Sequence, residues 1–422
     1  DSPEEHFTDT IKAACGLADP NAVWGMTQAA PELVHWLLKL GVKFNMSGYN
    51  DVDLRNFGGQ KKKRTAFAQS DTGKQIMTAM IDAIRRKEAS GMVERFSHHS
   101  FLTLRLCGNI CCGCVIRDEY SQETVELPGD AVIVATGGMH GLFGNTTGSL
   151  SNTGEVTAEL FRLGVPLANG EMIQYHPTTV KCGGKRMLIS EAARGEGGRL
   201  FAMKDGKQWY FMEEKYPELG NLMPRDITAR EIWKVSHESE VFLDMTEISE
   251  EIISNKLSGL ADDCMTYLHK DIRKEPVSVL PGVHYFMGGI LVDEQHRTPI
   301  QNVYAAGECC AQYHGANRLG GNSLLGALYG GRVAAKSACE QADVVDLSCA
   351  TQIDFPPASQ ISEIKQLNKV MQETMGVVRN ENTLLNGIQT VQALTGNLPL
   401  LGMAVLKSAL ARKESRGAHW RE

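Results

Sequence analysis

The first ninety residues show the apolar spacing of amphipathic helices. In APELVHWLLKLGVKF, Leu33, Leu37 and Leu40 recur every three or four residues, which places them on one helical face. Gly41 follows this stripe, and glycine commonly ends a helix because it adopts the left-handed conformation without strain. We therefore expect helices within residues 7–42, and a similar spacing predicts another over residues 74–88.

From residue 101 the apolar spacing changes to the alternation of β-strands. FLTLRLC and ICCGCVIR flank Gly108 and Asn109, a pair typical of a hairpin turn, and ETVELP continues the antiparallel layer. The segment DAVIVATGG differs, because Ala131–Ala135 is an unbroken apolar run that leads into Gly137 and Gly138. Such a run is typical of a buried strand in an open α/β sheet.

The pattern changes again around residues 177–283, where short helices, turns and strands are mixed. Strands resume in GGILVDEQ and NVYAAGE, and NSLLGALYGGRVAAKSA predicts a helix capped by Asn322 or Ser323. We expect an α/β protein in which an open-sheet domain is divided by an insertion and followed by helices. The expected domains are residues 1–176 and 284–345 for the sheet, 177–283 for an inserted α+β domain, and 346–422 for a C-terminal helical domain.

Composition narrows the class of protein. The 422 residues include 43 Lys and Arg against 50 Asp and Glu, a formal net charge of −7, which argues against nucleic-acid binding. No apolar run reaches the ~18 residues of a transmembrane helix. The chain opens with the polar DSPEEHF, which is unlike a signal peptide. We therefore expect a cytoplasmic protein.

A cluster of cysteines, CGNICCGC, lies in the predicted hairpin. Along a regular strand Cys112 and Cys114 would face one side and Cys111 the other, so the four cysteines of residues 107–114 could not surround one ion. We expect ordinary strand residues there and no bound metal, with a metal site as the alternative.

The segment VYAAGE places Glu308 at the carboxyl end of a predicted strand, a position suited to binding sugar or ribityl hydroxyls. The helix that begins near Ser323 offers unpaired N–H groups and the positive end of its dipole to an anion. The alternative is a core helix without a ligand, and the residues alone do not choose between the two.

Several polar side chains are embedded in glycine-rich or apolar stretches. Arg side chains match carboxylates with two parallel hydrogen bonds, and His donors add orientation, so together these residues could bind a small dianion. Taken singly, each His is more often structural, and Glu191 with Arg194 could be a helical ion pair. The set is His176, Glu191, Arg194, Arg225, His284, His314 and Arg318.

The strings ATGG, HPT, SEAARGEGG, PRD, VHYFMGGI, AAGE, HGANRLGGNSLLGAL and ARKESRGAHWRE occur in this order. Together they resemble the flavoprotein subunits of succinate dehydrogenase and fumarate reductase, as does FGGQKKKRTAFAQSDTG before the hairpin. That family interconverts fumarate and succinate on FAD. The resemblance implies that the divided sheet is the FAD-binding domain and that the insertion is a capping domain.

The resemblance also implies roles for individual residues. Arg225 would donate the proton to the substrate, and Glu191 and Arg194 would resupply it. Five residues would contact the substrate: His176, Ser190, His284, Arg318 and Phe57. Six would contact the flavin: Gly137, Gly138, Glu155, Glu308, Ser323 and Leu324.

Two features differ from the family's pattern. The G-x-G-x-x-G loop that holds the FAD pyrophosphate is absent from these 422 residues, as is the segment with the family's flavin-linked His. We therefore expect an incomplete FAD-binding sheet that lacks its first βαβ unit. At residues 152–156 the chain reads NTGEV where the family has TGDG, so Val156 narrows the room beside Glu155.

The resemblance further implies a separate iron–sulfur subunit as electron-transfer partner and, through it, a membrane anchor at the cytoplasmic face of the inner membrane. Two other functions remain as alternatives. One is an L-aspartate oxidase, although HYFMGGI and NRLGGNSLLGAL are closer to the first family. The other is a non-catalytic fragment that serves as a scaffold.

Overall fold

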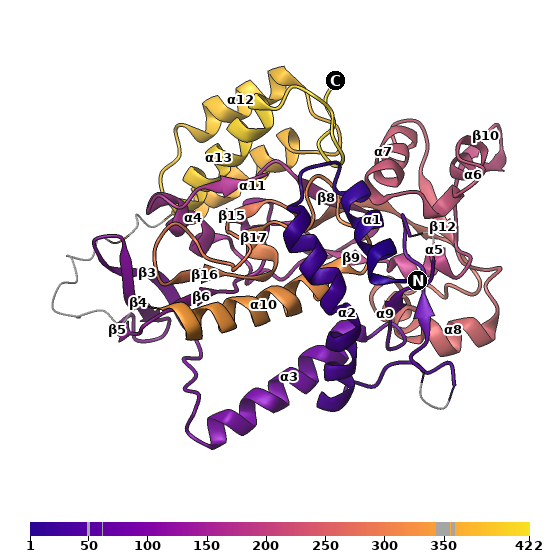
Figure 1. Cartoon of the computed structure of the whole chain (residues 1–422). Helices are drawn as coiled ribbons and strands as arrows, with labels where there is room; N and C mark the ends of the chain where they lie inside the picture. Colours follow the sequence, from indigo (N-terminus) through magenta and orange to yellow (C-terminus); the bar gives the residue numbers. More distant parts are fainter. Residues whose placement is uncertain (49–50, 61, 343–354, 356–358) are drawn as a thin grey trace.

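The computed structural model describes residues 1–48, 51–60, 62–342, 355 and 359–422, and it is a mixed α/β fold (Figure 1). The helices predicted near the N-terminus are present. Asp19 caps the second of them, and Gly41 ends it with a φ of 100°. Leu37 packs in one apolar core with Ile76 from the third helix. These helices are α1 (Pro3–Ala13), α2 (Pro20–Leu40) and α3 (Thr72–Ala89).

The predicted hairpin is also present, and a third strand continues its antiparallel sheet. Gly113, with a φ of 138°, lies at a bulge that leaves Cys112 without a partner on the opposite strand. The regular alternation that we assumed for the cysteines is therefore wrong, and Cys111 and Cys112 are both buried. The strands of this part of the chain are β1 (Leu54–Arg55), β2 (Thr65–Ala66), β3 (His99–Cys107), β4 (Ile110–Asp118) and β5 (Thr124–Pro128).

Two short parallel strands, β6 (Val132–Val134) and β16 (Val303–Ala305), form the observed part of the open sheet. Because parallel strands end at the same edge, Gly138 and Glu308 meet there. A Cβ on Gly138 would lie 2.6 Å from Glu308 Oε1 and 2.7 Å from the Phe286 ring, so any other residue would require these side chains to move. Around this pair lie η1 (His140–Leu142), α4 (Glu155–Arg162), β7 (Leu167–Ala168), β15 (Gly289–Leu291), η3 (Gly307–Cys309) and β17 (Cys310–Ala311).

The helix predicted after β16 is α10 (Asn322–Gln341), but its predicted cap is wrong. Gly321 holds the capping position with a φ of 86°, and no side chain accepts the first N–H groups. The Asn322 amide instead bonds to His6 and Thr10 of α1. The Asn322 side chain, which the local sequence predicted as the cap, therefore forms a long-range contact instead.

Residues 177–283 contain a four-stranded sheet and an apolar core of their own, which extends from Ile189 to Val279. The chain leaves along β8 (Ile173–Cys182) and returns along β14 (Leu280–Phe286), and these two strands pair antiparallel. The expected junctions of the insertion lie inside this paired ladder. The other elements are β9 (Lys185–Leu188), α5 (Glu191–Gly195), β10 (Arg199–Lys204), β11 (Lys207–Trp209), α6 (Phe211–Lys215), η2 (Gly220–Leu222), α7 (Arg225–Val235), β12 (Val241–Asp244), α8 (Glu250–Lys256), α9 (Ser258–Leu268) and β13 (Val277–Ser278).

Three helices end the chain, as the sequence pattern predicted: α11 (Ile361–Thr374), α12 (Glu381–Val391) and α13 (Asn397–Ala411). They share an apolar core with η1 and with the end of β14, and in Figure 1 they cover one side of the molecule. The expected boundary between residues 345 and 346 lies outside the described residues.

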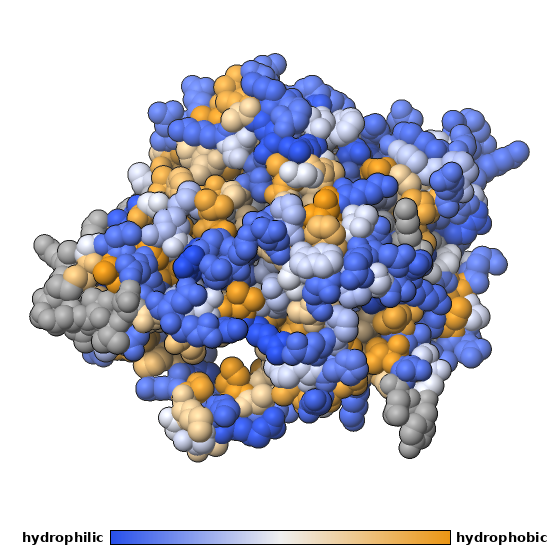
Figure 2. Space-filling view, in the orientation of Figure 1, coloured by the Kyte–Doolittle hydropathy of each residue, from blue (hydrophilic) through white to orange (hydrophobic). Residues whose placement is uncertain are grey.

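The surface is mostly polar on the face that Figure 2 shows, with small separate apolar patches. Among the described helices, none is long and apolar enough to cross a membrane.

Leu401 and Leu400 on α13 provide a matched pair for testing the helical packing. Leu401 is 0% exposed in the core shared with η1, whereas Leu400 is 38% exposed. We expect Leu401→Ala to lower the free energy of unfolding by about 2–5 kcal/mol, because the lost contacts leave a cavity. Thermal unfolding should show a lower midpoint for Leu401→Ala and a midpoint close to that of the parent protein for Leu400→Ala. Equal midpoints would contradict this packing.

Candidate active site

A cavity of about 380 Å³ brings together most of the residues that the sequence singled out. Arg194 lies behind the wall, in contact with Glu191. Gly137, Gly138, Glu155 and Glu308 do not line the cavity. The candidate residues that do line it are Phe57, His176, Ser190, Glu191, Arg225, His284, Arg318, Ser323 and Leu324.

The paired strands β8 and β14 place two imidazoles side by side. His176 lies opposite Gly282 in the ladder, and the rings of His176 and His284 have centroids 5.1 Å apart at 71°. Burial, followed by the charge of Arg225, lowers the pKa of His176. Burial and the neighbouring His176 lower the pKa of His284. Both rings are therefore neutral at pH 7.

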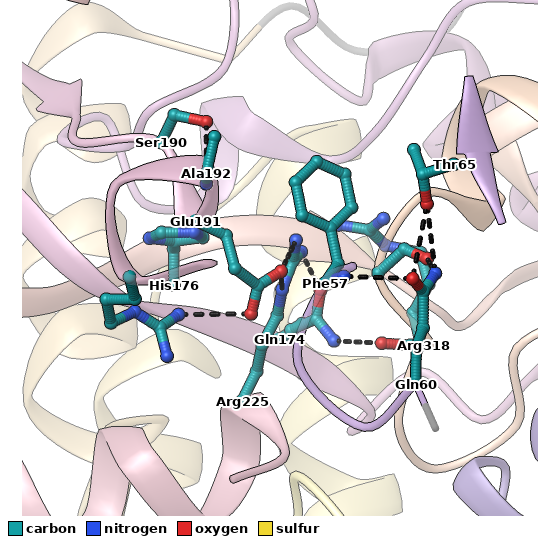
Figure 3. Close-up of polar contacts among 12 residues, drawn as sticks. Phe57, Gln60, Thr65, Gln174, His176, Ser190, Glu191, Ala192, Arg225 and Arg318 are labelled. Carbon is teal, nitrogen blue, oxygen red and sulfur yellow. Dashed lines mark hydrogen bonds and ion pairs between the residues drawn. The ribbon is translucent and has the colours of Figure 1, made fainter. Parts of the chain in front are cut away.

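Glu191 is the centre of a buried ion network (Figure 3). Its Oε2 accepts hydrogen bonds from Arg225 Nε at 3.0 Å and Nη2 at 2.6 Å, and its Oε1 accepts one from Arg194 Nη2 at 3.0 Å. Burial would raise the pKa of Glu191, but the charges of Arg225 and Arg194 outweigh burial and lower it to about 2. Glu191 and Arg194 thus form the helical pair considered from the sequence, and Arg225 joins it from the start of α7.

Arg318 is a buried cation that forms no ion pair with a carboxylate among the described residues. Its residue is 3% exposed, and its guanidinium carbon lies 4.3 Å from the centre of the Tyr285 ring. Within the described ranges no carboxylate pairs with Arg318, and its Nε has no hydrogen-bond partner. Burial and the charge of Arg225 lower its pKa. Burial of an unpaired cation of this kind costs free energy unless an anion binds it.

The described residues that line the cavity include more cations than carboxylates, although Arg64 is paired with Asp1 and Asp9, which do not line it. Four arginines line it, and Glu191 is the one carboxylate among the described lining residues. Both oxygens of Glu191 already accept from guanidinium groups. The arginines are Arg55, Arg64, Arg225 and Arg318. The cavity is therefore suited to an anion and offers no free carboxylate to a cation.

Sequence reasoning missed Gln174, which joins the two central arginines. Its Oε1 accepts from Arg225 Nη1 at 3.0 Å, and its Nε2 donates to the carbonyl of Arg318 at 2.9 Å (Figure 3). Gln174 lies two residues before His176 on β8, so the period of a strand could have placed both side chains on the same face.

Ser190 and Phe57 lie at the edges of the same site. The Ser190 hydroxyl accepts the N–H of Ala192 and so caps α5 while it lines the cavity. Phe57 lies against Gly320, where an added Cβ would come within 2.5 Å of the Phe57 Cβ. The apolar Phe57 ring therefore lines the same cavity as Arg225 and Arg318.

Comparisons with known proteins show the family to which the chain belongs. The sequence model of the FAD binding domain family matches residues 1–324, and that of the fumarate reductase flavoprotein C-terminus matches residues 395–422. The chain is 36% identical to the succinate dehydrogenase flavoprotein subunit of Bacillus subtilis, over all of this chain and 81% of that protein. The chain belongs to the succinate dehydrogenase and fumarate reductase flavoprotein family.

Further comparisons outline the breadth of this family. A solved quinol-fumarate reductase structure with menaquinol has a TM-score of 0.88 at 26% identity, covering 100% of this chain and 82% of that one. L-aspartate oxidase of Pyrococcus furiosus is 32% identical over all of this chain and 84% of that protein. The fold and the FAD-dependent oxidoreductase class expected from the sequence are thereby confirmed.

The residues present fit a flavin at the start of α10. No side chain of the described residues caps this 20-residue helix, and its first residues line the cavity together with Arg225 and Arg318. Its free N–H groups, at Ser323 and Leu324, suit the negative edge of a flavin ring. Glu308 uses Oε1 to accept the N–H of Phe286, and no hydrogen bond to its Oε2 occurs among the described residues.

The buried imidazoles make stability depend on pH. Burial lowers the pKa of His176, His284 and His314, the last to about 3, whereas an unfolded His titrates near ~6.5. Below about pH 6.5 the unfolded chain therefore binds more protons than the folded chain does. For each pH unit below that value, each buried imidazole lowers the free energy of unfolding by about 1.4 kcal/mol.

We expect the melting temperature of the ligand-free protein to fall between about pH 7 and pH 5. His314→Gln should reduce this slope, and replacement of the exposed His237 by Gln should leave it unchanged. A slope that His314→Gln does not alter would contradict the burial of a neutral ring.

Proposed function

We propose that this protein interconverts fumarate and succinate. The observation that carries the proposal is the buried, uncompensated Arg318 in a cavity that also contains Arg225 and two neutral imidazoles. A four-carbon dicarboxylate supplies two negative charges to that wall, and guanidinium groups bind carboxylates with paired, charge-assisted hydrogen bonds. Family membership supports the same substrate, because relatives include succinate dehydrogenase and fumarate reductase subunits.

In this proposal His176, His284 and Arg318 bind the two carboxylates, and Phe57 packs against the carbon chain. Ser190 lines the substrate space at the start of α5. When bound, the flavin supplies or accepts a hydride. The preorganised cations stabilise the negative charge that develops on the substrate, and they do so strongly because the site excludes water.

Arg225 is the proposed proton donor, at its guanidinium N–H groups. A guanidinium is a weak acid in water, but a carbanion beside a carboxylate is a strong base, so a correctly placed guanidinium can protonate it. Glu191 holds Arg225 through two hydrogen bonds and contacts Arg194 on its other side. This continuous contact supports a route by which Arg194 and Glu191 resupply the proton.

The remaining assignments concern the cofactor and the domains. We propose that Gly137, Gly138, Glu155, Glu308, Ser323 and Leu324 hold the flavin. Of these, Ser323 and Leu324 line the cavity, and Glu155 has the weakest support because Val156 narrows the room beside it. We further propose that residues 1–176 and 284–345 form the FAD-binding domain, 177–283 the capping domain and 346–422 the helical domain. The capping segment supplies Glu191, Arg194 and Arg225, so it completes the catalytic wall.

L-aspartate oxidase is the second candidate, because curated relatives with that activity are 32% and 34% identical to the chain. Aspartate carries an ammonium group, which requires an acceptor. The one carboxylate among the described lining residues is occupied by two arginines. The charge of the cavity therefore favours a plain dicarboxylate over aspartate.

An assay of the flavin-loaded protein with each substrate tests this choice. We expect fumarate reduction with a reduced dye, succinate oxidation with an oxidised dye, and no peroxide from L-aspartate. Aspartate-dependent peroxide without dicarboxylate turnover would favour the oxidase. Flavin binding without turnover of any of the three would favour a non-catalytic scaffold.

We propose that electrons pass to a separate iron–sulfur subunit, and that a membrane anchor is reached through it at the cytoplasmic face. The Bacillus subtilis relative is the flavoprotein subunit of a succinate dehydrogenase, which supports such a partner. Co-purification of the tagged full-length protein from its own cells, with iron analysis of the complex, would test this assignment.

A further inference from the structure

His284 is held at one ring nitrogen and open at the other. Its Nδ1 lies 2.7 Å from the hydroxyl of Thr147, in the loop between η1 and α4. The ring lines the cavity, and its Nε2 has no hydrogen-bond partner in the part of the chain that the structure describes. A neutral imidazole has one N–H and one lone pair, so the partner of Nδ1 decides what Nε2 presents to a ligand.

The Thr147 hydroxyl has one proton and two acceptors within reach. The His284 Nδ1 lies at 2.7 Å, whereas the carbonyl of Val283 lies at 3.4 Å. That carbonyl already accepts the backbone N–H of Thr147 at 3.0 Å. The shorter contact and the satisfied carbonyl both direct the hydroxyl proton to Nδ1.

We propose that Thr147 is a positioning residue that holds His284 as the neutral tautomer with its proton on Nε2, so that this N–H donates to a substrate carboxylate. The identity of the ligand rests on the proposed function, whereas the place of the proton does not. In the opposite tautomer, a nitrogen lone pair would face the carboxylate and repel it.

The surroundings of His284 disfavour the doubly protonated ring, so the ring can donate a hydrogen bond to a ligand from Nε2 only as this tautomer. The charged and titratable groups that act on it are His176, Arg225, Arg318 and His140, and together with burial they disfavour the doubly protonated ring. The loop is also fixed at its backbone, because Thr147 bonds to Val283 and the carbonyl of Thr146 accepts the N–H of Arg186. The hydroxyl therefore approaches the ring from a defined direction.

Nuclear magnetic resonance of protein labelled with ¹⁵N-histidine tests the proton position without flavin or turnover. His284→Gln assigns the ring signals by their loss. We expect the wild-type shifts to show a protonated Nε2, and Thr147→Val to shift the signals toward a mixture of tautomers. A wild-type ring protonated on Nδ1 would overturn the proposal, even if Thr147→Val fails to fold.

Affinity for malonate, measured by calorimetry, tests the consequence. Thr147→Val should weaken binding about tenfold, as loss of one oriented hydrogen bond predicts. Thr147→Ser keeps the hydroxyl and should bind within about twofold of wild type, as should the control Ser149→Ala, whose exposed hydroxyl contacts the N–H of Ser151. Unchanged affinity in Thr147→Val would contradict the inference. Failure of the wild type to bind malonate would instead contradict the proposed function, and the tautomer would still be decided by resonance.

Discussion

Replacement of Arg225 by Ala is expected to reduce turnover by at least about 10²–10⁴-fold, the range supplied by a positioned general acid. The reason is geometric as well as chemical. Arg225 sits at the start of α7, and its guanidinium is fixed by Glu191 on one side and by Gln174 on the other. No other guanidinium among the described residues has both of these partners together with a place in the cavity wall.

Arg225→Lys sharpens this prediction. A lysine keeps the charge but cannot donate to Glu191 and Gln174 in the planar arrangement of a guanidinium. We expect turnover to be lost in both variants while the flavin spectrum is kept, and malonate binding to weaken less than turnover. Lys234→Ala, an exposed change on the same helix, is the control. Retained turnover in either Arg225 variant would show that the proton comes from another group.

Replacement of Arg318 by Gln is expected to weaken malonate binding by at least about 30-fold, or 2 kcal/mol, because truncation of one partner of a buried charge pair has costs of that size or larger. The same change should raise the melting temperature of the ligand-free protein. Arg318 is then buried without a counter-ion and close enough to Arg225 for its pKa to be lowered. Its removal relieves the cost of an unpaired buried charge.

This pair of opposite effects separates a ligand-binding arginine from a structural one. A structural Arg318 would lower stability when removed and leave malonate affinity unchanged. The control is Arg332→Gln on α10, the helix that follows Arg318, since Arg332 is exposed and pairs with Glu32 at the surface. It should change neither quantity by more than a few tenths of a kcal/mol.

Features governed by local pattern could be predicted from the sequence. The stripe of Leu33 and Leu37 predicted α2, and Gly41 predicted its end. The apolar run before Gly137 predicted a buried strand of an open sheet, and β6 does pair parallel with β16, but Ile133 at its centre is 41% exposed. Most of the polar residues embedded in apolar stretches line one cavity, whereas Arg194 and His314 do not, and burial of a charged group is costly unless a partner or a ligand compensates it.

Features set by long-range contacts could not be predicted in the same way. Asn322 looks like a helix cap, but its amide instead forms hydrogen bonds with His6 and Thr10 of α1. The bulge at Gly113 shifts the alternation that the cysteines would follow on a regular strand. Thr147 reaches His284 across 137 residues of sequence, and no local signal marks that contact.

A crystal structure of the protein with bound malonate tests the central claim most directly. The account predicts one ligand in the cavity, with its carboxylates within hydrogen-bonding distance of Arg318, His176 and His284 and with Arg225 facing the carbon chain. Malonate bound elsewhere, or these four side chains turned toward bulk solvent, would contradict it.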